Sequence, residues 1–378
     1  MNLMRFKLAP TLAVVASGMV FPAAYAEEQS LAIEEVVVTA RKQEESSQDV
    51  PIAMTAISEQ LENSTIRNLT DLNGFAPNVT IGEDGSRGGG GAVINIRGIS
   101  PTRSDDNSFD APIGVMIDGV YLGTLAGQVL ENFDLERVEV LRGPQGTLFG
   151  KNTVGGVVNV IRSRPTGELG ARLKATIGED GQQEFRAVVN TPVIEDVLAA
   201  KFFYTSQEDD GFMKNVTLGG DAATKDYQNY GAAFLWTPND KFEATLTVEK
   251  FDDTSNLTAF NTNYNVAPGV LVAPSDPNAT DFSGGFLNCA LAPQTCRTSL
   301  STPKDSENDT ENKAELVTDA ITLNMSYDLN ENLTIVSTTG YRDLEEYRIY
   351  DFDASSVPFI TIERFNEYDQ LSQELRID

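Results

Sequence analysis

From Leu169 onward, apolar and polar residues alternate with a period of two in segments of about ten residues. In 241–251 one face carries Phe242, Ala244, Leu246 and Val248, and the other carries charged and hydroxyl side chains. The segments 169–177 and 320–329 alternate in the same way. Because successive side chains of a strand point to opposite faces, the pattern predicts strands with one apolar and one polar face.

The spacing of these segments limits the possible architectures of the sheet. Strands are expected near 169–178, 182–191, 197–206, 227–237, 241–251, 317–328, 332–342 and 371–378. The links after the second, fourth and sixth strands are short, and those after the third, fifth and seventh are long; of the odd links only the first, 179–181, is short. Outer-membrane barrels have short periplasmic turns and long outer loops, whereas a soluble sandwich has no reason to sort its links by parity. The pattern favours an incomplete antiparallel transmembrane β-barrel, about eight strands of a larger barrel.

Residues 48–165 differ from this part in composition and in the pattern of apolar residues. They are dense in glycine and contain short β-branched runs, at 92–96, 113–117, 138–141 and 157–161. Between Ser58 and Leu72, apolar residues follow the helical period, which predicts a helix. This part is expected to be a small α+β domain.

The first 26 residues have the layout of a secretory signal peptide. Arg5 and Lys7 precede a short apolar stretch, and residues 24–26 read Ala-Tyr-Ala, a small-x-small cleavage site. A membrane anchor is the alternative, but Pro10 and Gly18 interrupt the stretch. Export makes a loop disulfide between Cys289 and Cys296 the expected state of the two cysteines.

The composition excludes several functions. The chain has 28 Lys and Arg against 56 Asp and Glu, a net charge of -28, and no histidine. Such a surface repels phosphate backbones, so a nucleic-acid partner is not expected. Without histidine the chain lacks the commonest general base and the commonest zinc ligand, so we expect no enzyme, no metal site and no cofactor. Acidic loops around Asp252 and Asp305 could chelate calcium, but they lack the EF-hand spacing.

Four motifs then carry a family resemblance. They are EEVVVTARK at 34–42, INIRGIS at 94–100, PIGVMIDGVYLG at 112–123 and LERVEVLRGPQGTLFGKNTVGGVVNVIRSR at 135–164. In this order they resemble the N-terminal half of TonB-dependent receptors. The resemblance implies a signal peptide at 1–26, a flexible segment at 27–47, a plug domain at 48–165 and a partial β-barrel at 166–378.

The resemblance also implies a function. Such receptors take up a scarce ligand, such as a ferric siderophore or another nutrient, across the bacterial outer membrane, with the plug gated by TonB. The implied partners are the C-terminal domain of TonB, outer-membrane lipid and a small-molecule ligand. A passive, porin-like outer-membrane channel with an internal plug is the alternative, and it would need no TonB-binding segment. An outer-membrane enzyme would normally use a Ser–His pair, which this chain cannot form.

The run IEEVVVTA is the candidate TonB-binding segment. It is short, rich in valine and flanked by polar residues, so it can add as a strand to the sheet edge of a partner. From the run alone, an ordinary first plug strand is an equal alternative. The resemblance identifies it as the TonB box, formed by Ile33, Glu34, Glu35, Val36, Val37, Val38, Thr39 and Ala40.

The glycine-rich runs have a structural and a functional interpretation. The run LRGPQGTLFG fits no phosphate-loop register, since Asn152 follows Gly150-Lys151, and tight turns explain its glycines better. The second glycine-rich run, Gly88 to Gly91, is a mobile loop by default. The resemblance places it near the outer apex of the plug, as a candidate ligand-contact loop of Arg87, Gly88, Gly89 and Gly90.

Arg97 and Arg142 are candidate contacts between plug and barrel. The resemblance implies that they meet inward-facing glutamates, and Glu374 is the candidate because it shares the polar face of its strand with Arg376. Arg–carboxylate pairs are directional but add little net stability once desolvation is counted, which suits a plug that must both seal and release. Solvated surface arginines are the alternative.

Overall fold

The computed structural model describes most of the chain after the first 36 residues. The described residues are 37–43, 45–58, 61, 66, 68–83, 91–101, 110–128, 134–256, 305–306, 308–352, 358 and 360–378. All of them belong to one compact unit, Val36–Asp378. Among these residues, no helix has the length and apolar character needed to cross a membrane.

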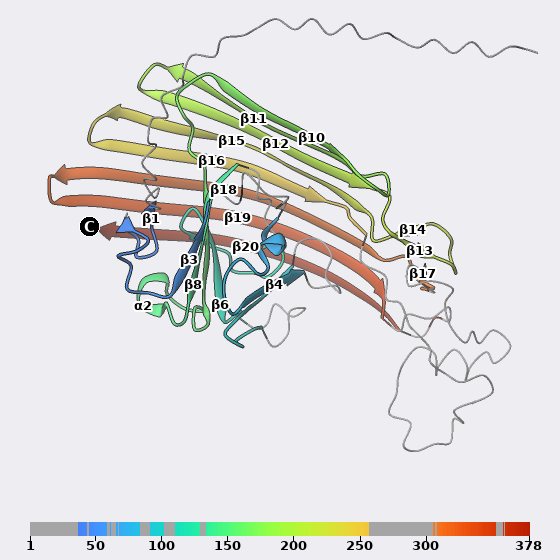
Figure 1. Ribbon diagram of the computed structural model, residues 1–378. Helices are drawn as coiled ribbons and strands as arrows, with labels where there is room; N and C mark the ends of the chain where they lie inside the picture. The colour runs from blue at the N-terminus through green and yellow to red at the C-terminus, as the bar shows by residue number, and fades with distance from the viewer. Residues whose placement is uncertain are drawn as a thin grey trace, which may run out of the picture. The chain divides into compact units, whose positions relative to one another are not determined.

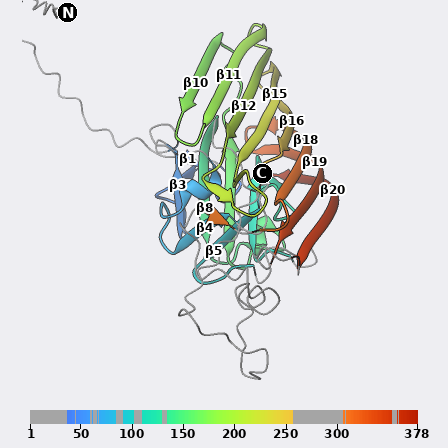
Figure 2. The ribbon, with the colours of Figure 1, turned by 90° about the vertical axis from the view of Figure 1, so that its right-hand side faces the viewer.

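An antiparallel sheet of eight strands, here called the wall, forms the larger part of the described structure (Figures 1 and 2). Its strands lie side by side in chain order. They are β10 (Gly170–Ile177), β11 (Gln183–Ile194), β12 (Leu198–Asp209), β15 (Lys225–Asn239), β16 (Phe242–Asp253), β18 (Lys313–Asn330), β19 (Leu333–Asp351) and β20 (Thr361–Ile377). The eight expected strands are confirmed. The links after the second, fourth and sixth are short, and so is the link after the first, 178–182.

Three of the strands are much longer than the alternation of apolar residues predicts. β18 has 18 residues, β19 has 19 and β20 has 17. The reason is that the period of two continues beyond the apolar segments, with charged residues replacing apolar ones on the outer face. In the long links, β13 (Met213–Asn215), β14 (Asp221–Ala222) and β17 (Asp305–Ser306) form a small sheet of their own.

The two faces of the wall differ as expected. Large exposed apolar side chains lie on the outer face and include Leu173, Phe202, Trp236, Leu246, Ile321, Tyr341, Leu371 and Leu375. On the inner face, Lys201, Glu249 and Asn324 contact residues that precede the wall in the chain. The wall therefore turns its polar face toward the N-terminal part of the chain.

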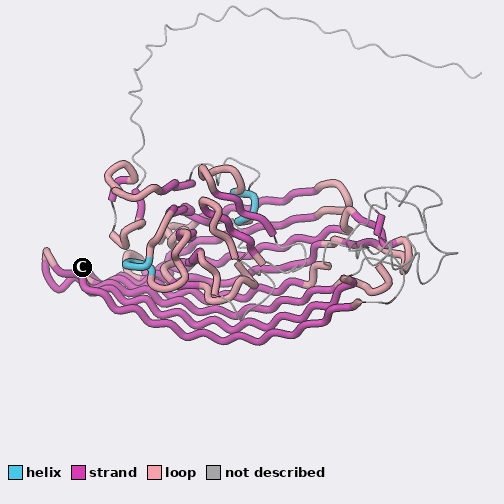
Figure 3. Tube along the Cα trace, turned by 90° about the horizontal axis from the view of Figure 1, so that it is seen from below, coloured by secondary structure: helices cyan, strands magenta, loops and turns pink. Residues whose placement is uncertain are grey.

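Residues 48–165 of that N-terminal part are here called the plug. Its main sheet has the order β3-β8-β9-β6-β7, and a second pair, β4 and β5, lies beside it. The strands are β3 (Met54–Ile57), β4 (Val79–Glu83), β5 (Ala92–Ile96), β6 (Ile113–Ile117), β7 (Val120–Tyr121), β8 (Leu135–Arg142) and β9 (Gly156–Arg162). Helix is scarce among the described residues (Figure 3). It comprises Leu61, a 3-10 turn, η1 (Leu69–Leu72), and the four-residue α2 (Gly146–Phe149).

The helix predicted from Ser58 to Leu72 is described only in part. Its last turn is η1, and the residue that caps it is Asn68, whose side chain accepts a hydrogen bond from the backbone of Thr70. The apolar period still marks the core, since Leu61, Ile66, Leu69 and Leu72 are all buried. The described residues of this apolar period are therefore core residues, and Leu61 is helical as predicted.

The main plug sheet has two differently filled faces, and β8 shows both. Val138 and Val140 pack in the large core with residues of β6 and β9. On the opposite face, Leu141 packs with Val157 and with residues of an N-terminal hairpin. This N-terminal hairpin consists of β1 (Val37–Val38), β2 (Glu45–Ser46) and the turn between them. It covers the second face of the plug sheet.

Candidate functional site at the plug–wall interface

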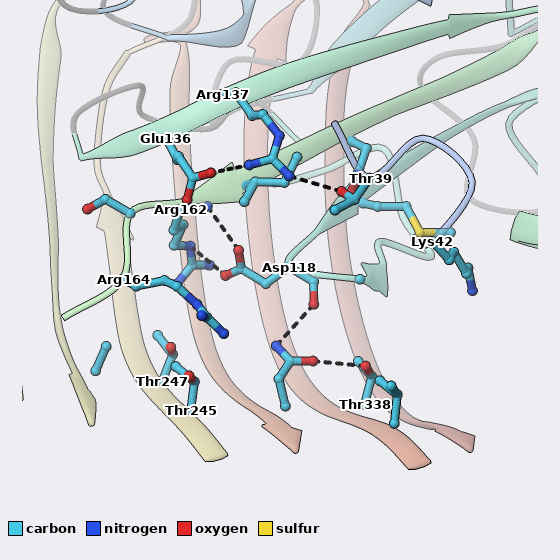
Figure 4. Close-up of a pocket in the computed structure, with 18 of the residues that line it drawn as sticks. Thr39, Lys42, Asp118, Glu136, Arg137, Arg162, Arg164, Thr245, Thr247 and Thr338 are labelled. Atoms are coloured by element: carbon cyan, nitrogen blue, oxygen red, sulfur yellow. Dashed lines mark hydrogen bonds and ion pairs between the residues drawn. The ribbon is translucent and has the colours of Figure 1, made fainter. Parts of the chain in front are cut away.

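A cavity of about 390 Å³ lies between the plug and the inner face of the wall. Side chains from the hairpin, the plug strands and the wall line it, and most of those labelled in Figure 4 are charged or hydroxylated. We call it the interface cavity. Its lining contains Lys42, Asp118, Arg137, Arg162, Lys201, Asn324, Thr338, Glu374 and Arg376.

Arg162, the last residue of β9, joins the plug to the wall. Its guanidinium contacts Glu249 of β16 at 2.7 Å and Asp118 of the plug at 3.4 Å. Its backbone N–H donates to Asp118 Oδ1 at 2.9 Å. Burial disfavours the charged form, but the two carboxylates outweigh it and raise the pKa of Arg162 above its usual value. This arginine is therefore a fixed positive charge between two acids.

The residues that follow β9 continue this contact. Arg164 forms an ion pair with Glu243 of β16, in an exposed position. Ser163 donates its hydroxyl to Asp134 at 2.5 Å, and the same carboxylate pairs with Lys201 of β12 at 2.5 Å and Arg172 of β10 at 2.6 Å. The Lys201 side chain is only 2% exposed. Asp134 is thus a buried acceptor that fastens the plug to two wall strands.

The turn between β6 and β7 also rests on the wall. Asn324 of β18 donates to the backbone oxygen of Asp118 at 3.2 Å, and it accepts a hydrogen bond from Thr338 of β19 at 2.8 Å. Asp118 and Gly119 have φ values of 48° and 84°, so this tight turn uses the left-handed region. The turn presents backbone, rather than a long side chain, to the wall.

The segment after β7 packs against β19 and β20 at two glycines. The N–H of Gly123 donates to Gln370 at 3.1 Å, and Arg342 donates to the carbonyl of Gly127 at 3.1 Å. A Cβ at Gly123 would collide with the hydroxyl of Tyr368, and one at Gly127 would meet the guanidinium of Arg342. Glycine is required here because the plug backbone approaches wall side chains directly.

The N-terminal hairpin has contacts with both the plug and the wall. Lys42 forms an ion pair with Glu374 of β20, and Arg376 donates to the carbonyl of Lys42 at 2.9 Å. Within the hairpin, Arg41 pairs with Glu45, and the hydrogen bond from Arg41 lowers the pKa of the Glu45 carboxyl. The hairpin is therefore held at its turn by the wall.

Half of the predicted TonB box is described, and it forms the first strand of the hairpin. Val37 is 48% exposed, whereas Val38 and Ala40 are fully buried. Thr39 lies between them and lines the interface cavity. Ile33, Glu34, Glu35 and Val36 lie outside the described residues, as do Arg87, Gly88, Gly89 and Gly90 of the predicted ligand loop and the pair Cys289 and Cys296.

The structure does not bring Glu374 to Arg97 or Arg142. Glu374 is on the inner face, as expected, but its described partners are Lys42 and Arg376. Arg142 donates to the carbonyls of Pro77 and Met54 at 3.1 and 3.2 Å, because the end of β8 lies over neighbouring plug backbone. Arg97 is exposed, in a left-handed turn with φ 54°.

Sequence reasoning missed the ion pairs that do join plug and wall. The basic residues of these pairs are Arg162, Arg164 and Lys201. Their acidic partners are, in the same order, Glu249, Glu243 and Asp134. One signal was present: basic residues at the end of the IRSR run stand out in a chain of net charge -28. Another was that Glu243 and Glu249 fall on the polar face of their strand.

Comparison with known proteins gives consistent matches. Residues 46–157 match the family model described as TonB-dependent Receptor Plug Domain. The chain is 27% identical over 292 residues to the vitamin B12 transporter BtuB of Vibrio vulnificus, covering 74% of this chain and 45% of that protein. It is 31% identical over 172 residues to the iron-regulated outer membrane virulence protein of Vibrio cholerae, covering 42% of this chain and 24% of that protein.

Solved structures show the same fold. The ferric yersiniabactin uptake receptor FyuA of Yersinia pestis matches with a TM-score of 0.66 at 19% identity, over 86% of this chain and 45% of that one. The siderophore receptor PiuA of Acinetobacter baumannii matches with a TM-score of 0.66 at 18% identity, over 88% and 43%. The chain thus spans less than half the length of these proteins. The printed names of these matched proteins describe receptors and a transporter.

Proposed function

Because the chain belongs to the TonB-dependent receptors of the outer membrane and holds their plug domain with part of the barrel, we propose that it serves TonB-dependent uptake. The observation that carries the proposal is the seating of the plug on the polar inner face of the wall. Ion pairs such as Arg162–Glu249 and Lys42–Glu374 make this contact. Polar contacts exchange readily for water, so the plug can seal the barrel and still move.

The proposed partner on the periplasmic side is the C-terminal domain of TonB. The short turns of the wall mark the periplasmic side of an outer-membrane barrel. In the proposal residues 27–47 form a flexible segment after a signal peptide at 1–26, and residues 33–40 add as a strand to the sheet of TonB. The plug then spans 48–165 and the partial barrel 166–378.

The proposed ligand is a scarce nutrient, such as a siderophore-type iron complex. The relatives support this class, since their names include a vitamin B12 transporter and a ferric-pyoverdine receptor. In the proposal, Arg87 and Gly88 to Gly90 contact the ligand at the outer apex of the plug. A disulfide between Cys289 and Cys296 would stiffen one of the outer loops.

Deletion of residues 33–40 tests the proposal against a passive channel. We expect uptake of radiolabelled ferric siderophores or vitamin B12 to fall to the level of a receptor-free strain, because the plug can no longer be moved. Removal of residues 27–31 instead is the matched control and should leave uptake intact. Unchanged uptake after loss of 33–40, with normal receptor levels in the membrane, would favour the passive channel.

A further inference from the structure

Glu139 is a carboxylate buried in the middle of β8. Its side chain is 0% exposed, and it lies on the sheet face that the N-terminal hairpin covers. Oε1 accepts hydrogen bonds from the Thr39 backbone N–H at 2.7 Å, from the Thr39 hydroxyl at 3.2 Å and from Arg137 Nε at 2.8 Å. Oε2 accepts one from Asn159 at 3.1 Å. Two of these donors come from a residue 100 positions away in the chain.

The hydrogen bonds that Glu139 Oε1 accepts are complete only while Thr39 is in place. An ionised carboxylate taken out of water costs several kcal/mol unless it is paired and hydrogen-bonded. Arg137 supplies the opposite charge, but it also contacts Glu136 and donates to the Thr39 hydroxyl at 3.1 Å (Figure 4). Arg137, Glu139 and Thr39 therefore form one closed group of hydrogen bonds, to which Asn159 is added from β9.

Thr39 is the residue before the last of the predicted TonB box. A strand that adds to the sheet of a partner uses its backbone N–H and carbonyl groups for pairing. The N–H of Thr39 is already given to Glu139, and the neighbouring Val38 and Ala40 are fully buried. A partner can pair with the end of the box only after this hydrogen bond is broken.

We propose that Glu139 is a latch that holds the end of the TonB box on the plug and sets how often this segment becomes available to TonB. The proposal rests on the proposed function and adds the positioning residue that regulates it. Glu139 touches neither ligand nor TonB; it acts through Thr39.

The latch can open without leaving a buried, unpaired charge. Thr39, Arg137 and Asn159 all line the interface cavity, so the group lies at its border. When the hairpin departs, the carboxylate keeps Arg137 and Asn159 and faces the cavity, where water replaces the two donors of Thr39. The contact is therefore specific when closed and reversible when opened.

The test compares Glu139→Gln with Glu136→Gln in the complete receptor that contains this chain. Glu139→Gln keeps the size but replaces charge-assisted hydrogen bonds by neutral ones of about half the strength. Glu136 is the matched control, since it lies on the same strand and pairs with the same arginine, but its side chain is 46% exposed and has no described contact with Thr39. Both substitutions are made with Val38→Cys, which places a thiol at a fully buried position of the box.

The first readout is the rate at which a membrane-impermeant maleimide labels this introduced thiol from the periplasmic side. We expect about a tenfold faster rate in Glu139→Gln, as loss of a hydrogen bond to a charged group implies, and no change in Glu136→Gln. The second readout is the apparent affinity for the purified C-terminal domain of TonB without ligand. It should rise by a similar factor, because a larger fraction of the segment is free to bind.

Equal labelling rates in the two variants would overturn the latch. If Glu139→Gln does not assemble, Thr39→Val is the second variant. It removes the hydroxyl, which donates to Glu139 and accepts from Arg137, and keeps the backbone N–H. It should still speed labelling about threefold, and an unchanged rate would again overturn the latch. The labelling readout needs no TonB. Failure of the wild-type receptor to bind TonB would therefore reject the proposed function and leave the latch to be decided by labelling alone.

Discussion

At the scale of single residues, burial separates ion pairs that matter for stability from those that do not. Asp134 and its partner Lys201 have side chains 7% and 2% exposed. Asp319 and Lys250, on the outer face, have side chains 58% and 34% exposed. Exposed pairs contribute at most about 1 kcal/mol, whereas removing one partner of a buried pair leaves an uncompensated charge.

Asp134→Asn should therefore destabilise the receptor strongly. Asparagine tolerates the left-handed backbone at this position, where φ is 70°, so only the charge is lost. We expect a loss of about 3–5 kcal/mol in the free energy of unfolding, measured by chemical denaturation in lipid. Asp319→Asn is the control and should cost less than about 1 kcal/mol. Equal losses in the two variants would show that Asp134 is not an essential partner of Lys201.

Gly156→Ala tests a close approach inside the plug. A Cβ at Gly156 would collide with the carbonyl of Leu141 and lie 2.8 Å from Ile96 Cδ1, and φ is 152°. We expect a loss of at least ~2 kcal/mol of plug stability from overpacking and backbone strain. Gly146→Ala, where nothing lies within 4 Å, should be neutral or slightly stabilising. Thermal unfolding of the plug would measure both, and a stable Gly156→Ala plug would contradict the packing at this position.

Residue-level contacts were the hardest to predict from the sequence. Arg142 was expected to reach the wall, but it donates to two plug carbonyls. Glu374 was expected on the inner face and is there, but with Lys42 as its partner. The alternation of apolar and polar residues along a strand predicts the face on which each side chain lies. It carries no information on which residue of another element lies opposite, because that depends on how the plug is seated.

At the scale of elements, the outer face of the wall has an apolar band that ends sharply on the side of the long links. In β18 the outward residues of 321–329 are all apolar. In β19, Leu333, Ile335 and Tyr341 continue the band, and Ser337 and Thr339 interrupt it. About 9–11 residues of a tilted strand cross a bilayer, so the length of the band matches a membrane span. Directly beyond it, Lys250, Asp319, Asp343 and Asp369 are opposite one another on successive strands and form one charged row.

Leu246→Arg in β16 tests the apolar band. Leu246 lies on the outer face, paired with Leu323 inside the band of β18. An arginine near the bilayer midplane costs about 2–4 kcal/mol, so we expect a loss of this size in the folding free energy measured by denaturant titration in lipid vesicles. Asp252→Arg, on the same face but beyond the charged row, is the control and should change stability by less than about 0.5 kcal/mol. Equal effects would place the membrane elsewhere.

The elements themselves were largely predictable. The wall strands could be located because their period of two is sustained over several segments and bounded by turn residues. The plug was harder. The fully buried β6 and β9 are short apolar runs without alternation, and their parallel pairing joins residues more than 40 positions apart, so no local pattern reveals it.

At the scale of the whole molecule, the contact between plug and wall is polar and is held at several separate points. Arg162 and Glu249 form one of its largely buried pairs, with side chains 16% and 15% exposed, and Arg164 with Glu243 forms an exposed one. Buried pairs should control the seal, because exposed pairs are screened by water and salt.

Glu249→Arg should loosen the plug, since it places a positive charge against Arg162. We expect passage of a hydrophilic solute too large for ordinary porins to rise several-fold in a liposome-swelling assay. The double variant Arg162→Glu with Glu249→Arg should restore part of the seal, which is the signature of a direct pair. Glu243→Arg is the control and should leak little, because Arg164 is 57% exposed. A tight seal in Glu249→Arg would show that this pair does not retain the plug.

The charged row above the apolar band has a mechanical consequence. Any inward tug on the N-terminal hairpin has an equal reaction, and the bilayer must supply it through the wall. To be dragged inward, the wall would have to carry Lys250, Asp319, Asp343 and Asp369 into hydrocarbon, where a lysine costs up to about 2–4 kcal/mol and an aspartate less. The charged row thus resists inward movement of the wall. An inward force on the hairpin would then act on the plug instead.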